Sequence, residues 1–234
     1  MSEIDYHLSE LEIARTKGNH RRIMPVLPDG FQSILDLGCG IGQTLIACEL
    51  NPKTFACGVD IDAESLAYGK ELSPYIRFVC ARREHLPFRD QSFEVVISRV
   101  SLPYTHIPSA LQEIARILTP SGYVWFTLHP FTRLREDAIG AIRSGNLKSF
   151  VYAIYTLING ICFHLTGRLF RFPLMGNRYE SFQTVGGMTR AMHRAGFEQV
   201  RMECDRFFVV TAVKRDWSPH TNTKEDTICA ESAA

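Results

Sequence analysis

Short apolar runs alternate with segments of helical periodicity along most of this chain. Residues 33–37, 54–60, 75–81, 93–100 and 122–129 predict strands, and residues 42–50, 63–72 and 107–118 between them predict helices. The strands are continuous apolar runs rather than alternating patterns, which is typical of a parallel sheet with helices on both faces. The pattern therefore predicts an α/β fold.

The two ends of the chain extend this pattern. Apolar residues at helical spacing predict a helix over residues 3–16, and residues 19–27 predict a short second helix that is broken near Pro25 and Pro28. A helix over 185–197 and two strands over 198–205 and 207–215 complete the series. Residues 216–234 are polar and have no periodicity. We therefore expect one domain over residues 1–215 and a flexible tail over 216–234.

Composition narrows the class of protein. The chain has 234 residues, of which 45% are hydrophobic, and its formal net charge is +1. That size supports one sizeable core, and the absence of a basic field disfavours nucleic acid as a partner. The seven cysteines are odd in number, scattered and free of any CxxC pair, which favours reduced thiols in a cytoplasmic location and no metal site. The first residues do not resemble a secretory signal.

Three glycines follow the first predicted strand at alternate positions, in the stretch ILDLGCGIGQT. Gly38, Gly40 and Gly42 would let the backbone turn sharply and approach a ligand at the carboxyl edge of the sheet. Asp60 ends the second strand, where its carboxylate can accept both hydroxyls of a ribose. A glycine turn beside an acidic strand end predicts a nucleoside site.

Asp36 and Gln43 indicate which nucleoside would bind. The third glycine of a dinucleotide fingerprint is replaced by Gln43, which argues against a nicotinamide dinucleotide. A carboxylate at Asp36 would repel a pyrophosphate but suits the ammonium group of an amino acid. S-adenosylmethionine is a nucleoside with such an ammonium group, and it is the cofactor that we expect.

Together, the stretches ILDLGCGIGQT, GVDID, HLPFRDQSFEVVIS and ALQEIARILTPSGYVWFTLH resemble the successive motifs of class I S-adenosylmethionine-dependent methyltransferases. The resemblance covers about residues 20–130 and 182–214, and the nearest group is the small-molecule "type 11" group, which includes quinone-ring methyltransferases. It implies a Rossmann-like sheet of seven mostly parallel strands, with the last strand antiparallel. It also implies cofactor-binding roles for Asp36, Gly38 and Gly40 around the methionine end, Asp60 at the ribose, Ile61 against the adenine and Ser98 on the methyl-transfer side. We also expect their sequence neighbours in these stretches to contribute to cofactor binding: Cys39, Gly42, Gln43, Arg82 and Arg83.

Arg82 is a departure from the family pattern. Family members often carry an aspartate at this position, which accepts a hydrogen bond from the adenine amino group, whereas a guanidinium has no acceptor. Backbone contacts to the adenine ring could replace that hydrogen bond, and Arg82 could instead stack on the ring.

Three side chains near the ends of the fourth and fifth strands are candidates for catalysis. Methyl transfer mainly requires alignment and exclusion of water, and a general base is needed only where the acceptor must lose a proton. Tyr104, His106 and His129 are the candidates, and for each of them the simpler interpretation is a packing or surface role. His129 is favoured because TLHP ends a strand at the active-site edge.

Residues 131–181 fall outside the family pattern and predict a helical insert before the last helix and strands. Seven Lys or Arg residues outnumber three acidic ones, and residues 149–167 carry no Asp, Glu, Lys or Arg. The length approaches that of a membrane span, but Thr156, Asn159, Gly160 and His164 interrupt it. The alternatives are a cap packed over the sheet edge, or a lid over an apolar acceptor that makes peripheral membrane contact through residues 147–171.

The sequence thus predicts methyl transfer from S-adenosylmethionine to a small apolar or amphiphilic acceptor, such as a quinone, a phenol or a lipid-like molecule. Two alternatives remain: a catalytically silent nucleoside-binding member of the family, and a nucleotide-dependent oxidoreductase. The sequence leaves open the acceptor itself, the atom that is methylated and the oligomeric state.

Overall fold

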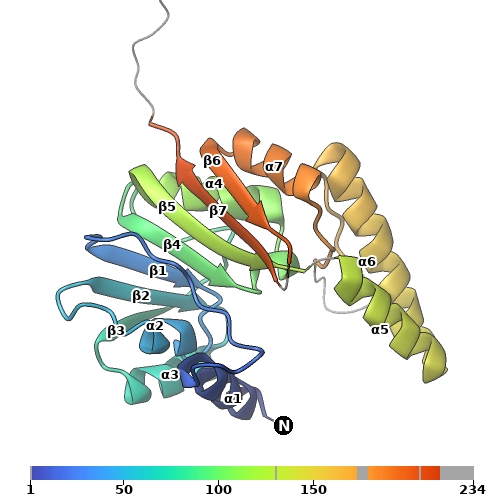
Figure 1. Ribbon diagram of the computed structural model, residues 1–234, viewed down its shortest axis with the longest axis horizontal. Coiled ribbons are helices and arrows are strands. Elements are labelled where there is room, and N and C mark those ends of the chain that lie inside the picture. The colour runs from blue at the N-terminus through green and yellow to red at the C-terminus, as the bar shows by residue number, and fades with distance from the viewer. Residues whose placement is uncertain (1, 130, 173–178, 206, 217–234) are drawn as a thin grey trace, which may run out of the picture.

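Seven strands form one sheet in the order β3-β2-β1-β4-β5-β7-β6 (Figure 1). The computed structural model describes residues 2–129, 131–172, 179–205 and 207–216. The strands are β1 Ser33–Leu37, β2 Phe55–Asp60, β3 Ile76–Cys80, β4 Phe93–Arg99, β5 Leu118–Leu128, β6 Phe197–Glu203 and β7 Phe208–Lys214. Strands β1 to β5 pair in parallel, and β7 runs antiparallel to both of its neighbours. The predicted Rossmann-like fold is confirmed, including its antiparallel last strand.

Helices cover both faces of this sheet. The helical elements of the described residues are α1 Glu3–Arg15, α2 Gln43–Ala47, α3 Ala63–Leu72, the 3-10 turn η1 Leu102–Tyr104, α4 Ile107–Ile117, α5 Phe131–Arg143, α6 Leu147–Thr166 and α7 Val185–Arg194, and of these α5 and α6 do not lie on the sheet. Leu35 and Leu37 of β1 pack in one apolar cluster with α4 and α7, whereas Ile34 packs in another with α2. Burial on both faces explains why the strands read as unbroken apolar runs.

The predicted second helix near residue 20 is wrong. Residues 23–28 contain no helix, and Ile23 and Leu27 lie against the apolar cluster that covers one face of β1. Pro25 and Pro28 lack the backbone N–H that a helix interior needs, so an extended segment covers this face instead.

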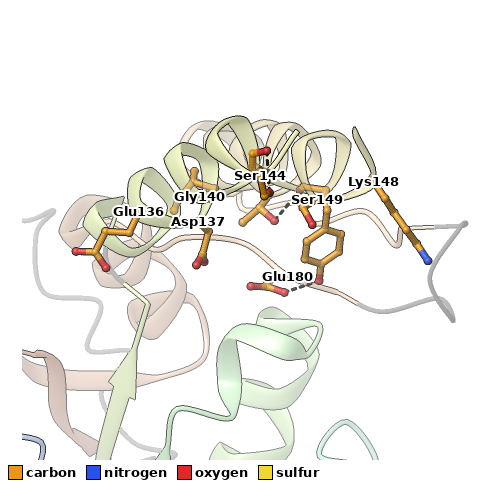
Figure 2. Close-up of a pocket in the computed structure, with 12 residues that line it drawn as sticks. Glu136, Asp137, Gly140, Ser144, Lys148, Ser149 and Glu180 are labelled. Atoms are coloured by element: carbon orange, nitrogen blue, oxygen red, sulfur yellow. Dashed lines mark hydrogen bonds between the residues drawn. The ribbon is translucent and has the colours of Figure 1, made fainter. Parts of the chain in front are cut away.

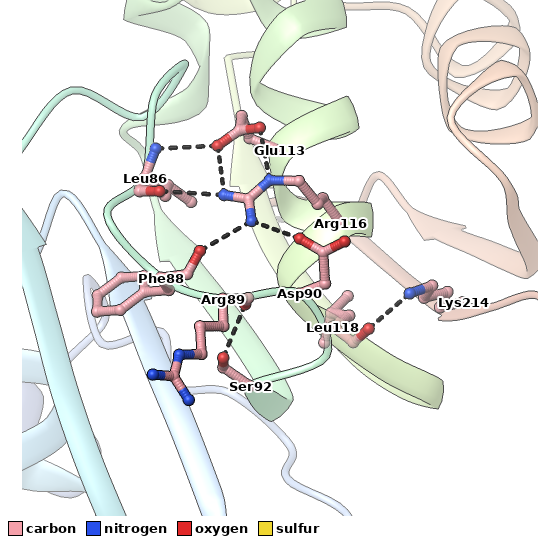
Figure 3. A network of polar contacts seen from close by, with 9 residues as sticks. All are labelled: Leu86, Phe88, Arg89, Asp90, Ser92, Glu113, Arg116, Leu118 and Lys214. Carbon is pink, nitrogen blue, oxygen red and sulfur yellow. Dashed lines mark hydrogen bonds and ion pairs between the residues drawn. The ribbon is translucent and has the colours of Figure 1, made fainter.

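The guanidinium of Arg116 joins α4 to the loop that leads into β4 (Figure 3). Arg116 donates hydrogen bonds to the carboxylates of Glu113 and Asp90 and to the backbone carbonyls of Leu86 and Phe88. Glu113 in turn accepts from the backbone N–H of Leu86. These contacts fix the loop directly after the stretch that contains Arg82 and Arg83.

Helices α5 and α6 are inserted between β5 and α7 and extend beyond the end of the sheet (Figure 1). Phe163 of α6 is buried in the main core, and Gly160 packs so closely on Phe182 that a Cβ would lie 2.3 Å from its ring. The insert is therefore anchored to the domain through one face of α6. Of the predicted tail, Asp216 accepts a hydrogen bond from Ser121, and residues 217–234 lie outside the described residues.

Candidate functional site

The turn after β1 depends on glycine. Gly38, Gly40 and Gly42 have φ angles of 78°, 54° and 82°, in the left-handed region that side chains disfavour. The N–H groups of Gly38 and Cys39 both donate to the carbonyl of Val59 in β2, at 2.7 and 3.1 Å. The turn is thereby held against the end of β2.

Asp60 links the two halves of this site. Its Oδ2 accepts from the N–H of Gly40 at 2.9 Å, and its Oδ1 accepts from the N–H groups of Ile61 and Asp62 at 2.7 and 3.2 Å. The carboxylate therefore shapes the glycine turn, in addition to the role predicted for it at the ribose. Oδ1 already accepts two bonds, so Oδ2 is the atom with capacity left for a ribose hydroxyl.

Asp36 is a buried carboxylate without a hydrogen-bond donor. It is 1% exposed, and neither oxygen has a hydrogen-bond partner in the described part of the chain. Burial raises its pKa to about 7, although Arg99 and Arg83 act to lower the pKa. A buried anion with two unused acceptors fits the ammonium group of S-adenosylmethionine, so the methionine end of the expected cofactor fits these residues.

Helix α1 covers the glycine turn. The ring of His7 occupies the space beside Gly40, where a Cβ would lie 2.4 Å from the ring, and Nδ1 of His7 lies 3.3 Å from Nε2 of Gln43. Glu10 pairs with Arg99 at 3.2 Å. The sequence predicted α1 but gave it no part in the site, because nothing in its apolar spacing indicates what its polar face contacts.

The predicted adenine side lies around the loop after β3. Ile61 is 61% exposed beside Asp60, which suits a residue that packs against a flat ring. Arg82 is exposed and its Nε lies 3.7 Å from the carboxylate of Glu84. Arg83 instead points inward, and its guanidinium lies 2.5 Å from the position that a Cβ on Gly38 would take. The two neighbouring arginines therefore have different surroundings.

Ser98 lies beneath the turn. It is fully buried, and its hydroxyl donates to the carbonyl of Leu37 at 2.9 Å. Ser101 donates to the same carbonyl, and its side chain packs on Gly38. Ser98 thus supports the end of β1, and its hydroxyl is engaged by the Leu37 carbonyl and by the Ser101 hydroxyl, 2.5 Å away.

Tyr104 and His129 are brought together at the carboxyl ends of β4 and β5. Their rings meet edge to face with centroids 5.1 Å apart. His129 is 9% exposed, and its backbone is held on both sides by Gln183, whose side-chain oxygen accepts from the His129 N–H and whose N–H donates to the His129 carbonyl. The favoured catalytic histidine is therefore rigidly placed, with a tyrosine at its face.

His106, the third candidate, has different neighbours. Its Nδ1 lies 2.8 Å from the hydroxyl of Ser109 at the start of α4, and its ring lies 5.3 Å from that of Tyr179. Burial lowers its pKa, and Arg171 acts in the same direction, whereas Glu84 raises it. These contacts favour a structural role at the helix start.

A pocket of about 540 Å³ lies between α5 and α6 (Figure 2). Glu136, Asp137 and Glu180 are its acidic lining residues, and Asp137 and Glu180 lie beneath the two helices. The hydroxyl of Tyr152 in α6 donates to Glu180, and burial and this carboxylate raise the tyrosine pKa.

Sequence reasoning missed Tyr152 and Glu180. Both come from the insert, and neither belongs to a motif. The charge-free run from 149 to 167 contains Tyr152 and Tyr155 among apolar residues, and these two tyrosines, beside the interruptions at Thr156, Asn159 and His164, indicate that α6 also presents polar groups.

Residues 35–126 match the family described as "Methyltransferase domain". The chain is 41% identical over 101 residues to the uncharacterized methyltransferase YodH of Bacillus subtilis, an alignment that covers 41% of this chain and 42% of that protein. It is 25% identical over 169 residues to the demethylmenaquinone methyltransferase of Chlorobaculum parvum, covering 71% of this chain and 66% of that protein.

Solved structures are similar in fold. A putative S-adenosylmethionine dependent methyltransferase from Listeria monocytogenes superimposes with a TM-score of 0.56 at 21% identity, over 90% of this chain and 98% of that one. This likeness concerns the fold alone. The aligned part of the chain spans less than half the length of the first curated relatives it matches.

Proposed function

Because this chain carries a class I S-adenosylmethionine-dependent methyltransferase domain, we propose that it moves a methyl group from that cofactor to a small apolar or amphiphilic acceptor. The observation that carries the proposal is the Tyr104–His129 pair, which stands at the carboxyl ends of β4 and β5 beside an inserted helical pair. In open α/β sheets this edge is where ligands bind.

The residues around the glycine turn would hold the cofactor. Asp36 pairs with its ammonium group, Asp60 accepts from the ribose, and Ile61 packs against the adenine. The cofactor supplies a methyl group on a positively charged sulfur, which is already activated for displacement. The protein therefore has to align the acceptor and exclude water.

His129 and Tyr104 would act on the acceptor side. Where the acceptor is a phenol or another hydroxyl, the imidazole of His129 accepts its proton as the methyl group arrives. Gln183 holds the His129 backbone at both its N–H and its carbonyl, which fixes the backbone of this residue at the end of β5. Tyr152 of α6 donates to Glu180, and both residues line the pocket between α5 and α6.

An aromatic, partly apolar acceptor suits this setting. Tyr104, His129 and Tyr152 are aromatic, and Phe131 of the insert meets Phe182, directly after the insert, edge to face with centroids 5.2 Å apart. One relative is named for a quinone, demethylmenaquinone, which supports a ring acceptor with an apolar chain.

The test is a turnover assay with labelled S-adenosylmethionine and three acceptor classes: a hydroquinone with a free ring position, a phenol and a fatty-acid carboxylate. We expect label in the hydroquinone or the phenol. His129→Ala should lower turnover about 100-fold, the usual contribution of a general base, while the control His20→Ala, an exposed histidine, should not.

Other outcomes of these assays would support one of the two alternative functions or exclude His129. Binding of S-adenosylhomocysteine without turnover of any class would favour a silent family member. Binding of NAD in preference to S-adenosylhomocysteine would favour an oxidoreductase. Equal turnover by His129→Ala and the wild type would remove His129 from the mechanism.

A further inference from the structure

Helix α6 carries an exposed apolar stripe along its outer face. The residues of this stripe follow one another at intervals of four and three, and each of them is 40–73% exposed. They are Leu147, Val151, Ile154, Ile158, Ile161 and Leu165. Such spacing places all six on one side of a helix. Single exposed apolar residues are ordinary, but six in a continuous row form a patch that indicates a partner.

The opposite face of α6 already has its partner within the domain. The residues of α6 that the fold buries are Ala153, Thr156, Asn159, Gly160 and Phe163. The side chain of Asn159 donates to the carbonyls of Phe170 and Glu180 and accepts from the N–H of Phe170. These contacts fix the rotation of the helix, so the apolar stripe faces outward permanently.

A shallow apolar groove of about 240 Å³ runs beside the stripe. It lies between α6 and the segment that follows it, and its lining is Val151, Ile154, Tyr155, Ile158, Asn159, Phe170 and Phe172. Phe170 is 55% exposed. The groove and the stripe form one surface, which we call the α6 outer face.

Basic residues mark both ends of the α6 outer face. Lys148 is exposed at its start, and Arg168 and Arg171 are exposed after its end, with no charged residue between them. The acidic residues of the insert line the pocket between α5 and α6, and Lys148 stands at the edge of the same pocket with its side chain pointing away from Glu180 (Figure 2). The outer face is therefore apolar along its length and positive at both ends.

This charge pattern indicates which partner binds to the α6 outer face. If two copies paired along α6, basic ends would meet basic ends in either orientation. Anionic lipid headgroups would complement both ends while the apolar stripe enters the upper acyl region. Of the described helices, α6 has the length and apolar composition of a membrane span, but its inner face is committed to the domain.

We propose that the α6 outer face docks the protein on the surface of an anionic bilayer, with α6 lying in the plane of the interface. The inference is independent of methyl transfer, because docking needs neither cofactor nor acceptor.

The test uses the full chain and sedimentation with vesicles of phosphatidylcholine, with or without phosphatidylglycerol. We expect binding only with phosphatidylglycerol, weakening as salt rises. Ile158→Glu and the pair Arg168→Glu/Arg171→Glu should each lower the partition coefficient about tenfold or more. The controls Val26→Glu and Lys53→Glu/Arg77→Glu change exposed residues outside the insert and should bind as the wild type does.

A second measurement reports the depth of the helix. Leu165→Trp should show a blue-shifted emission on anionic vesicles, and Ile158→Ser replaces Ile158→Glu if the charged variant unfolds. Equal binding to both vesicle types, or no effect of the α6 variants, would overturn the proposal. A dimer in solution that Ile158→Glu dissociates, without vesicle binding, would make a second copy the occupant. Resistance to alkaline extraction would indicate a span rather than surface docking.

Discussion

Glu10 in α1 and Arg99 at the end of β4 form an ion pair, with 3.2 Å between Oε2 and Nη2. Both side chains are largely shielded, at 13% and 8% exposure. The pair joins the helix that covers the glycine turn to the strand next to β1.

Glu10→Gln should lower the free energy of unfolding by about 1–3 kcal/mol, because the largely shielded Arg99 and the more exposed Arg21, which also pairs with Glu10, both lose their carboxylate partner. Urea unfolding of the variant against Glu12→Gln, an exposed carboxylate on the same helix, measures the effect. Equal stability of the two variants would show that the ion pair contributes nothing to the position of α1.

Asp36→Asn should change stability and binding in opposite directions. The pKa of Asp36 rises from 3.8 to about 7 on folding, so the folded state holds a proton between these values where the unfolded chain does not. The contribution of Asp36 to the free energy of unfolding of the wild type therefore falls as pH rises through this window. The variant should be more stable than the wild type at pH 8. Its stability should also depend less on pH below pH 8.

The same variant should bind S-adenosylhomocysteine more weakly at pH 8, because the ammonium group loses its anion. Calorimetry measures the affinity, and Asp29→Asn, an exposed site, is the control. Unchanged affinity would show that Asp36 does not bind the cofactor. The burial of Asp36 would then have no functional reason.

Asp60→Ala should weaken S-adenosylhomocysteine binding by about 1.5–3 kcal/mol, the range for a hydrogen bond to a charged group. The control is Asp62→Ala, which removes the cap of α3, where Asp62 accepts from Glu64 and Ser65. The control should lose about 1 kcal/mol of stability and keep its affinity. If both variants lost affinity alike, the effect would be one of folding and the ribose assignment would fail.

Gly40→Ala should destabilise the protein, because the new methyl group would lie 2.4 Å from the His7 ring. The left-handed φ of Gly40 adds strain that the double variant retains. His7→Ala should therefore rescue part of the loss, with a coupling energy of about 0.5–3 kcal/mol in a double-mutant cycle. If the stability changes of the two single variants were strictly additive, α1 would not contact the glycine turn in solution.

Arg116→Lys should cost about 2–3 kcal/mol, because an ammonium cannot reproduce the contacts of Arg116 to two carboxylates and two carbonyls (Figure 3). Arg89→Lys, an exposed arginine on the same loop, is the matched control. Thermal unfolding of both variants provides the comparison, and similar melting temperatures would show the network to be replaceable.

The sheet was predictable because a strand that is buried on both faces appears in the sequence as a continuous apolar run. Leu35 and Ile34 face different clusters, yet both are apolar, so β1 appears in the sequence as an unbroken run. The glycine turn and Asp60 were predictable for a related reason, since few residue types fit a left-handed turn at a strand end.

The parts that escaped prediction depend on long-range geometry. Residues 19–27 have apolar spacing close to that of a helix, but Ile23 and Leu27 reach the sheet in an extended segment. The contacts of His7 with the glycine turn and of Tyr152 with Glu180 join residues distant in sequence. Periodicity within one segment carries no information about such pairs.

Strand β7 lies between β5 and β6, although it is the last strand to be synthesised. The edge of β5, which includes Val124, Trp125 and Phe126, stays unpaired until residues 208–214 arrive. Closing that loop around the whole insert is entropically costly and slow. The nascent protein therefore passes through a stage with an open, apolar strand edge, at which self-association competes with completion of the sheet.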